Sequence, residues 1–507
     1  MRDCRKYRPS ARFIAALGAV CSILVGACGG SSSPGDAGGS GGAGGSGGAG
    51  DPQPERYIEV RGEPGAAALP ALPTGRAANM SLLEQAEIDR VEAADERAPS
   101  IRQTRLKVRI DQPDTEVTLT QTKHGFTFGF PIELGRFHEP EDLEWFTARM
   151  SEICDLAVLE SDAKWARVEP TPGARDFARA DADVAWAEEN GFAVKGHTLL
   201  WGIPMPLSSA ALPQWVEAQF PSTNLSEDEK TELRAIVKAF IQDSVTHYDG
   251  KLAYWDVTNE SMQVLAQWFI NRLGPGIINE AFAWAREADP EVKLVFNEWI
   301  VEVFTGFETP TAPEVRDRVL DLLAQGVPID ALGQQAHFAP SAAFVVPTVD
   351  ISGRTRIDDY ADALNALAET GLPIHITETN FIAPDDPELR AAQAEALLRL
   401  WWGHPSVEQI VFWGPWNKVA GRDEFDVGFW DNERKITRHG EAVFSLLNDR
   451  WRTRATLVSD ANGELALDAT YGDYVAQWSV DGQPYHANFR VDPDAAGTGI
   501  ALMTPTP

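Results

Sequence analysis

The stretch AYWDVTNE, residues 253–260, is a short apolar and aromatic run that ends in two polar residues, Asn259 and Glu260. Seven other runs of this kind occur along the chain. They are FTFGF (126–130), DLAVLES (155–161), AVKGHTLLW (193–201), KLVFNEW (293–299), ALGQQAHF (331–338), PIHITETNF (373–381) and QIVFWGPW (409–416). Their length and their content of β-branched and aromatic residues predict buried strands.

Segments with helical periodicity follow these runs. They lie near residues 141–153, 180–190, 227–247, 276–288, 312–325, 357–370, 387–403 and 434–448. Alternation of strand and helix predicts the α/β class, and eight such units fit a closed (β/α)8 TIM barrel over residues 124–450. The alternative is an open doubly wound sheet, which normally begins with a glycine-rich strand-to-helix turn that this sequence does not contain.

The composition excludes several classes of function. The 507 residues include 44 Lys plus Arg and 75 Asp plus Glu, so the formal net charge at pH 7 is −31. Proteins that bind nucleic acids hold the phosphates with clustered Lys and Arg, so we expect no nucleic-acid partner. The nine His are scattered without the spacing of a metal site, so we expect no metal and no cofactor.

Nearly every run ends in polar or indole side chains. The residues concerned are Glu160, Lys164, Trp165, His197, Trp201, Asn259, Glu260, Asn297, Glu298, Gln335, His337, Glu378, Asn380, Trp413 and Trp416. Because the C-terminal ends of barrel strands meet at one mouth, we expect these side chains to gather there. Two carboxylates without a metal cluster are suited to glycoside cleavage, where one protonates the leaving oxygen and the other meets the oxocarbenium-like centre.

The motifs ESDAKW, EPTPGARDFARAD, GHTLLW, WDVTNE, QQAH, ITET and FWG resemble glycoside hydrolase family 10, the family of retaining endo-β-1,4-xylanases. The resemblance covers roughly residues 104–450, with the motifs in family order. It implies that Glu260 is the acid/base and Glu378 the nucleophile, with carboxyl groups about 5–5.5 Å apart. We expect a raised pKa for Glu260 because a second carboxylate shares its pocket.

The resemblance also implies roles for the side chains around the two carboxylates. Asn259 would hydrogen-bond the 2-hydroxyl of the sugar that is cleaved, and His337 would orient Glu378. The sugars on the non-reducing side would be held by Glu160, Lys164, His197, Trp201 and Gln335, with Trp413 as a stacking floor. We expect Trp165 and Trp255 in the core and His375 as a buried structural histidine, and we assign no role to Glu298.

The chain departs from the family pattern at three places. Ser161 stands where the family usually has Asn, and Glu298-Trp299 stands in place of Asp-Tyr. In the last run, Pro415 and Trp416 follow where the family has an Asp and then a second Trp. Two interpretations stay open: Trp416 substitutes for that Trp from another angle, or the substrate differs from plain xylan.

The N-terminus is typical of an exported protein. Residues 1–27 combine a basic start with a short apolar run, which predicts a signal peptide. The residues Val25-Gly26-Ala27-Cys28 resemble a bacterial lipobox, which predicts lipidation of Cys28 and an anchor to the cell envelope, at the outer membrane or cell surface. The alternative is an ordinary cleaved signal peptide with free secretion.

The regions outside the barrel are predicted from composition and alternation. Residues 28–78 are rich in Gly, Ser and Pro and predict a flexible linker, and residues 79–123 predict a helix followed by a β extension. Residues 451–493 predict a small C-terminal β module, with a separate sugar-binding module as the alternative, and residues 494–507 a disordered tail.

The combined expectation is a monomeric, lipid-anchored, retaining endo-glycoside hydrolase whose partner is β-1,4-xylan. Two alternatives stay open. One is a glycosidase of another β-linked plant polysaccharide, such as β-1,4-glucan or decorated xylan, and the other is a non-catalytic glycan-binding surface lipoprotein.

Overall fold

The computed structural model describes residues 56–205, 207–299, 310–338, 356–381, 386–419, 427–493 and 497–505. The predicted signal peptide, Cys28 and the Gly- and Ser-rich stretch lie outside the described residues. Of the described helices, none is long and apolar enough to span a bilayer.

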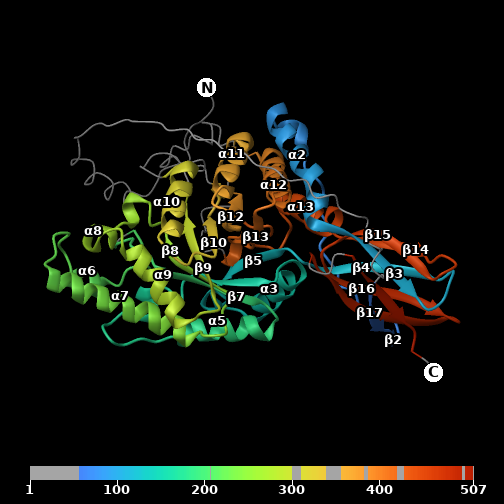
Figure 1. The fold of residues 1–507 in the computed structure, drawn as a ribbon, viewed down its shortest axis with the longest axis horizontal. Helices are drawn as coiled ribbons and strands as arrows, with labels where there is room; N and C mark the ends of the chain where they lie inside the picture. The colour runs from blue at the N-terminus through green and yellow to red at the C-terminus, as the bar shows by residue number, and fades with distance from the viewer. Residues whose placement is uncertain are drawn as a thin grey trace, which may run out of the picture. The chain divides into compact units, whose positions relative to one another are not determined.

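Eight parallel strands form a closed barrel (Figure 1). They are β5 (Thr127–Ile132), β6 (Leu156–Leu159), β7 (Ala193–Leu200), β8 (Tyr254–Asn259), β9 (Lys293–Glu298), β10 (Ala331–Gln334), β12 (Ile374–Phe381) and β13 (Val407–Phe412). Each pairs with the next, and β13 closes the ring by pairing with β5 through Ile410 opposite Phe128. A two-residue strand, β11 (His337–Phe338), extends the pairing with β12. All eight predicted strands and the predicted TIM barrel are confirmed.

Helices surround the barrel strands (Figure 1). They are α3 (Pro140–Ile153), α4 (Trp165–Val168), α5 (Ala178–Glu189), α6 (Gln214–Gln219), α7 (Glu227–His247), α8 (Ile270–Leu273), α9 (Ile277–Ala288), α10 (Ala312–Ala324), α11 (Ile357–Ala368), α12 (Pro387–Trp402) and α13 (Arg438–Phe444). Local sequence fixes their ends: Ser226 accepts from the Glu229 backbone N–H and Glu229 from that of Ser226, a capping box that starts α7.

Large aromatic side chains fill the space between strands and helices. Trp165 stacks on Phe240 with ring centroids 4.6 Å apart, and Trp255 packs against Gly196, where a Cβ atom would lie 2.2 Å from the indole. Both tryptophans are buried, as predicted, and so is His375, which packs edge-on against Tyr254. The barrel therefore has a solid interior that carries the strand ends on a rigid base.

A two-layered β sandwich is formed from both ends of the chain. One sheet has the order β1 (Arg56–Arg61), β18 (Thr498–Met503), β3 (Gln103–Ile110), β15 (Glu464–Thr470). The other has the order β14 (Arg454–Val458), β4 (Glu116–His124), β16 (Gly472–Val480), β17 (Gln483–Val491), β2 (Glu63–Pro64). Apolar side chains of both sheets, including Val108, Leu119, Trp478 and Leu502, share one core.

The sandwich corrects the predicted domain boundaries. The predicted linker end at residue 78 is wrong, because β1 and β2 lie within residues 56–64. The predicted disordered tail is wrong for residues 498–503, because β18 pairs with β1 on one side and with β3 on the other. The predicted N-terminal extension and C-terminal module are halves of one domain. Pairing between residues more than 400 positions apart leaves no local pattern in the sequence.

The segment between the sandwich and helix α2 (Gln85–Arg102) is attached to the barrel helices. Arg438 donates to the backbone carbonyls of Arg76 and Ala77, both at 2.9 Å, and the Ala78 N–H donates to Glu395. Gly75 lies so close to the Glu441 carbonyl that a Cβ atom would be 1.9 Å away. These contacts explain why residues rich in Pro and Ala, predicted to be a linker, form part of the folded unit that begins at Glu55.

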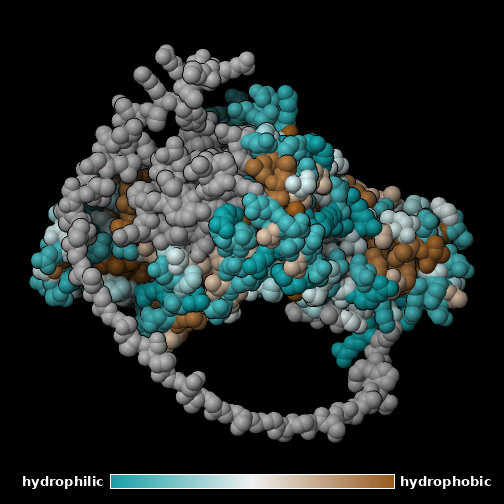
Figure 2. Space-filling model, turned by 90° about the horizontal axis from the view of Figure 1, so that it is seen from above, coloured by the Kyte–Doolittle hydropathy of each residue, from teal (hydrophilic) through white to brown (hydrophobic). Residues whose placement is uncertain are grey.

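The face drawn in Figure 2 is mostly hydrophilic, with apolar residues in separate patches. A mostly polar surface agrees with the net charge of −31. It also agrees with a fold in which the large apolar clusters of the described residues are buried.

Candidate active site

Polar side chains from successive strands converge at the C-terminal end of the barrel. His197 lies on β7, Asn259 on β8, Asn297 on β9 and Glu378 on β12, while Gln335 follows β10. All five are buried, and hydrogen bonds connect most of them. Buried polar groups in folded proteins are generally hydrogen-bonded, and most of these side chains satisfy one another. A connected polar network of this kind at the end of the barrel indicates a functional site.

Glu378 is held as a carboxylate by donors on both of its oxygens. Asn297 Nδ2 donates to Oε1 at 2.9 Å, and His337 Nε2 lies 3.1 Å from Oε2. Asn380 Nδ2 donates to His337 Nδ1 at 3.0 Å, so the ring directs its Nε2–H at the carboxylate. Burial alone would raise the pKa of Glu378, but the His337 hydrogen bond and the positive charge of Lys164 help to lower it to about 2.

Glu260 has the opposite electrostatic environment. Burial raises its pKa to about 7, and the charge of Glu378 adds to this rise. Two donors reach it: Gln335 Nε2 lies 3.1 Å from Oε1 and Trp201 Nε1 lies 3.0 Å from Oε2. Burial is a larger cause of this rise than the second carboxylate, on which the expectation from sequence rested.

The backbone of Glu260 is also unusual. Its φ is +56°, in the left-handed region that side chains with a Cβ rarely adopt. The turn is held by a 3.0 Å hydrogen bond from the Glu260 N–H to the Asn297 carbonyl. Such a turn aims the side chain away from the strand direction, and surrounding contacts must maintain it.

Asn259 is fixed by two donors to its side-chain oxygen. Asn297 Nδ2 lies 2.8 Å and Gln335 Nε2 lies 3.1 Å from Asn259 Oδ1, and Thr377 in turn donates to Asn297 Oδ1 at 2.7 Å. With its oxygen occupied, Asn259 presents its Nδ2 donor to a ligand. Asn297, which was expected at the mouth without a specific role, therefore joins the two strands that carry Asn259 and Glu378.

His197 is held by a buried ion-pair cluster that sequence reasoning missed. Its Nδ1 lies 2.9 Å from Asp256 Oδ2, and Lys195 Nζ lies 2.8 Å from Asp256 Oδ1. All three side chains are buried. The sequence did contain a signal for this cluster: Lys195 and His197 lie two positions apart inside an apolar run. An unpaired charge is unfavourable in such a buried strand, so a buried partner could have been expected.

Lys164, Trp201 and Glu160 line one side of the mouth. The Lys164 ammonium lies 4.8 Å from the centre of the Trp201 ring, and burial lowers the pKa of this lysine while Glu160, Glu378 and Glu260 oppose the change. Glu160 pairs with Arg136 at 2.8 Å. The structure thus places these residues beside the carboxylates, whereas their contacts with sugar stay predictions.

The tryptophans after β13 differ in position. Trp413 packs edge-on against His197, with centroids 5.6 Å apart, and remains slightly exposed. Trp416 is fully buried: its Nε1 donates to the Asp431 carbonyl at 2.9 Å and its ring packs against Trp145. The hypothesis that Trp416 replaces the missing tryptophan of the leaving side is therefore wrong, because its ring has no free face.

Glu298 lies directly behind the acid/base turn. Its Oε1 accepts from the Ser261 hydroxyl at 2.7 Å and from the Met262 N–H at 3.1 Å, while Oε2 has no hydrogen-bond partner among the described residues. Burial raises the pKa of Glu298 to about 8, with a smaller contribution from Glu260. This third carboxyl, unassigned from sequence, holds the residues that follow Glu260.

Across the described ranges no group of three or more His, Cys, Asp or Glu side chains is arranged to hold a metal ion. The site residues hydrogen-bond one another instead.

The model of the family described as glycosyl hydrolase family 10 matches residues 118–435. The chain is 31% identical over 316 residues to a β-1,4-xylanase of Dictyoglomus thermophilum, covering 56% of this chain and 80% of that one. It is also 29% identical over 416 residues to the anti-sigma-I factor RsgI6 of Acetivibrio thermocellus, covering 81% of this chain. The chain spans 49% of that factor and 34% of endo-1,4-β-xylanase 1 of Arabidopsis thaliana, to which it is 25% identical.

Among solved structures, xylanase 10B of Thermotoga maritima superposes with a TM-score of 0.53 at 25% identity. The match covers 64% of this chain and 95% of that one. Xylanase 10B of Thermotoga petrophila, solved in complex with xylobiose, gives a TM-score of 0.53 at 24% identity, covering 64% and 94%. Both likenesses support the barrel fold.

Proposed function

The chain belongs to glycosyl hydrolase family 10, and from that premise we propose that it cleaves the backbone of β-1,4-xylan internally, with retention of anomeric configuration. The observation that carries the mechanism is that two buried carboxyl groups at one mouth are linked by a chain of hydrogen bonds through Gln335, Asn259 and Asn297. Their surroundings shift their pKa values in opposite directions. The pKa of Glu260 is raised to about 7 and that of Glu378 is lowered to about 2. Two neighbouring carboxyl groups whose pKa values differ in this way are suited to act as an acid and a nucleophile at the same pH.

In the first step, Glu378 attacks the anomeric carbon and forms a glycosyl ester. Glu260, protonated below pH 7, donates its proton to the glycosidic oxygen as the bond to the leaving sugar breaks. The donors Asn297 and His337 place the Glu378 oxygens, and Lys164 contributes positive charge to the pocket.

In the second step, the ionised Glu260 takes a proton from water while the water oxygen attacks the same carbon. The ester bond breaks and returns Glu378 as a carboxylate. Its low pKa makes it a good leaving group. The donors Gln335 and Trp201 stabilise the ionised form of Glu260 between the two steps.

The residues around the carboxylates have the chemistry of a sugar site. Asn259 presents Nδ2 because its oxygen accepts two hydrogen bonds, which suits a contact with the sugar 2-hydroxyl. We assign the non-reducing side to Glu160, Lys164, His197, Trp201 and Gln335, and the stacking floor to Trp413. Ser161, shorter than the usual Asn, removes a possible hydrogen bond on this side.

The relatives named as β-1,4-xylanases support xylan as the substrate. The test is release of reducing sugar from β-1,4-xylan, with the product anomer followed by NMR and Glu378→Ala measured in parallel. Release that needs Glu378 and first yields the β-anomer is expected. Release of the α-anomer first would overturn retention, and release only from β-1,4-glucan would overturn the substrate. Retardation by xylan without turnover would favour the glycan-binding alternative.

We further propose that Cys28 carries lipid, that the protein is exported to the outer membrane or cell surface, and that it acts as a monomer. The lipobox-like residues 25–28 support the anchor. Radiolabelled palmitate should enter the wild-type protein and not Cys28→Ser, and light scattering should give the mass of one chain for the protein starting at residue 51.

A further inference from the structure

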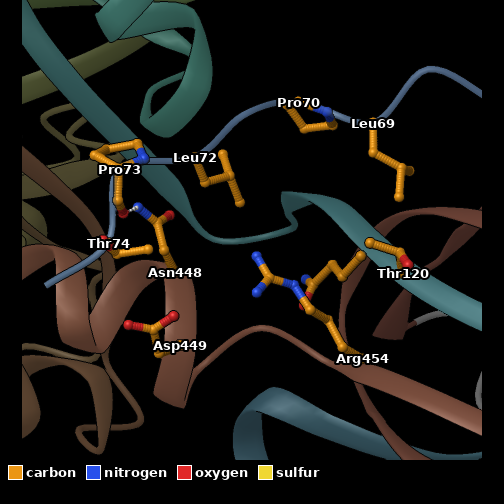
Figure 3. Close-up of a pocket in the computed structure, with 10 residues that line it drawn as sticks. Leu69, Pro70, Leu72, Pro73, Thr74, Thr120, Asn448, Asp449 and Arg454 are labelled. Atoms are coloured by element: carbon orange, nitrogen blue, oxygen red, sulfur yellow. Dashed lines mark hydrogen bonds between the residues drawn. The ribbon is translucent and has the colours of Figure 1, made fainter.

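A cavity of about 300 Å³ lies outside the barrel mouth, between the β sandwich and the last barrel helix (Figure 3). Strand β4 contributes Thr120 and β14 contributes Arg454. Asn448 and Asp449 come from the helical turn that follows α13, and Leu72 belongs to the segment before α2. None of these residues takes part in the mechanism above.

The wall of the cavity is fixed in place at both ends. At one end, Gly65 donates to the Pro484 carbonyl at 2.9 Å, next to the pairing of β2 with β17. At the other end, Asn448 Nδ2 donates to the Pro73 carbonyl at 2.7 Å. The segment between them carries Leu69 and Leu72, so an apolar wall with little freedom to collapse covers one side of the cavity.

The opposite side of the cavity carries polar groups with unused hydrogen-bonding capacity. Asn448 is 1% exposed, and its Oδ1 has no hydrogen-bond partner among the described residues. Asp449 and Arg454 line the same cavity, and neither forms an ion pair within the described chain. Figure 3 shows the Arg454 guanidinium directed toward the side formed by Asn448 and Asp449, below Leu72. A buried, unsatisfied amide oxygen is unfavourable unless a ligand or water pairs with it.

This chemistry restricts the class of ligand. Asp449 and Arg454 are both exposed and carry opposite charges, so together they favour neither an anion nor a cation, and the net charge of −31 disfavours an anion further. A neutral ligand with several hydroxyl groups suits both charged side chains and the Asn448 amide. Its hydroxyls can donate to the carboxylate and amide oxygens and accept from the guanidinium. The C–H face of a sugar ring matches the leucine and proline wall, and the volume is at the lower end of ligand pockets.

We propose that this cavity is a second, non-catalytic site that binds a sugar unit of the β-linked polysaccharide cleaved at the barrel mouth. The choice of polysaccharide rests on the proposed function. A chain held here would stay near the enzyme between cleavage events, which raises the effective concentration of substrate at the mouth.

The test uses the full chain carrying Glu378→Ala, so that the sugar is not consumed, titrated with xylohexaose by calorimetry. We expect two binding events. Arg454→Ala and Asp449→Ala should each weaken the second event at least tenfold, and Thr120→Trp should abolish it by filling the cavity while both charges remain. Arg105→Ala is the matched control, because Arg105 is an exposed arginine of the same sandwich that does not line the cavity.

A single binding event that Arg454→Ala, Asp449→Ala and Thr120→Trp leave unchanged would overturn the proposal. Hydrolysis of xylan by the wild-type protein is measured separately, so that the two proposals fail independently. Wild-type hydrolysis with one binding event overturns only the second site. Binding that depends on Arg454, without any hydrolysis, overturns only the catalytic proposal.

Discussion

The barrel mouth and the sandwich core are buried to a similar degree but differ in chemistry. At the mouth, Asn297, Glu298 and Thr377 are almost completely shielded from solvent, and each takes part in hydrogen bonds. In the sandwich, the shared core consists of apolar side chains such as Val108 and Leu502. Apolar burial stabilises folding directly, whereas a buried polar network contributes little net stability and mainly fixes geometry.

The difference predicts which changes affect activity and which affect stability. Substitutions at the mouth should lower turnover while the protein stays folded, because the network positions reacting groups. Substitutions in the sandwich core should lower the free energy of unfolding and leave the kinetics of the folded protein unchanged.

The largest effect is expected for Glu378→Ala, which removes the proposed nucleophile. We expect kcat on xylan to fall by roughly 10⁴-fold or more, as when other covalent nucleophiles are removed. Reducing-sugar release measures it, and circular dichroism checks the fold. Glu408→Ala, an exposed carboxyl on the barrel strand β13, is the matched control and should keep full activity. A fall below tenfold would exclude Glu378 as the nucleophile.

Glu260→Gln removes the proposed acid and should lower kcat/KM on xylan by roughly 10²–10⁴-fold. In the wild type, the pKa of Glu260 near 7 predicts that kcat/KM declines above about pH 7, as the acid loses its proton. The pKa of Glu378 near 2 places the acidic decline far lower. A pH series from 3 to 9 measures the basic limit, and no full acidic decline is expected within it. Persistence of the basic decline in Glu260→Gln would show that another group causes it.

In the sandwich, Trp478→Ala removes a buried indole that packs in the shared core and donates to Thr504. We expect a loss of about 3–5 kcal/mol in the free energy of unfolding, followed by urea and fluorescence. The value of kcat/KM below the transition should match the wild type. A tenfold loss of kcat/KM with intact folding would contradict the separation between the two regions.

The dependence of stability on pH should also come from the mouth. Glu260 has a folded pKa near 7, above its unfolded value, so the folded state holds an extra proton between about pH 4.3 and 7 and becomes less stable as pH rises through this range. Glu260→Gln should therefore gain roughly 3–4 kcal/mol over the wild type from pH 4 to pH 8. Unfolding at both pH values measures it, and an unchanged difference would show that Glu260 does not titrate in this range.

The smallest effect is expected for Glu298→Gln. The amide oxygen can still accept from Ser261 and Met262, so the turn after Glu260 should remain. Because the pKa of Glu298 is raised to about 8, its carboxyl is largely protonated at pH 7, so a neutral amide replaces a neutral acid and the basic limit of kcat/KM should stay near pH 7. Glu298→Ala removes the acceptor and should lower kcat further. A shift of the basic limit by more than about one pH unit in Glu298→Gln would show that Glu298 is ionised when Glu260 titrates.

The barrel was predictable from sequence because each of its units is local. A run such as residues 253–260 shows by its own composition that it is a buried strand, and the capping box at Ser226 marks the start of the helix that precedes this run. The strands β1 and β18 were missed because their partners lie at the other end of the chain. Their sequences alternate too weakly to be distinguished from the surrounding linker.

In the site, the residues at the ends of strands were predictable, and the contacts between them were not. Strand ends placed Glu260 and Glu378 at one mouth. Sequence gave no reason to pair Asn297 with Glu378 or Asp256 with His197, because such pairs depend on the register of neighbouring strands. The buried position of Trp416 was likewise not predictable, because it depends on packing against Trp145 rather than on the place of Trp416 after the strand.

The parallel pairing of β1 with β18 has a mechanical consequence. A tension transmitted along the backbone from residue 55 enters the folded unit at Arg56, on an edge strand whose partners run from Thr498 to Met503. When the pull is directed along the strand, these backbone hydrogen bonds are loaded together in shear instead of opening one at a time. Under the proposed anchor at Cys28, a pull on the folded unit would therefore load the hydrogen bonds between β1 and β18 first.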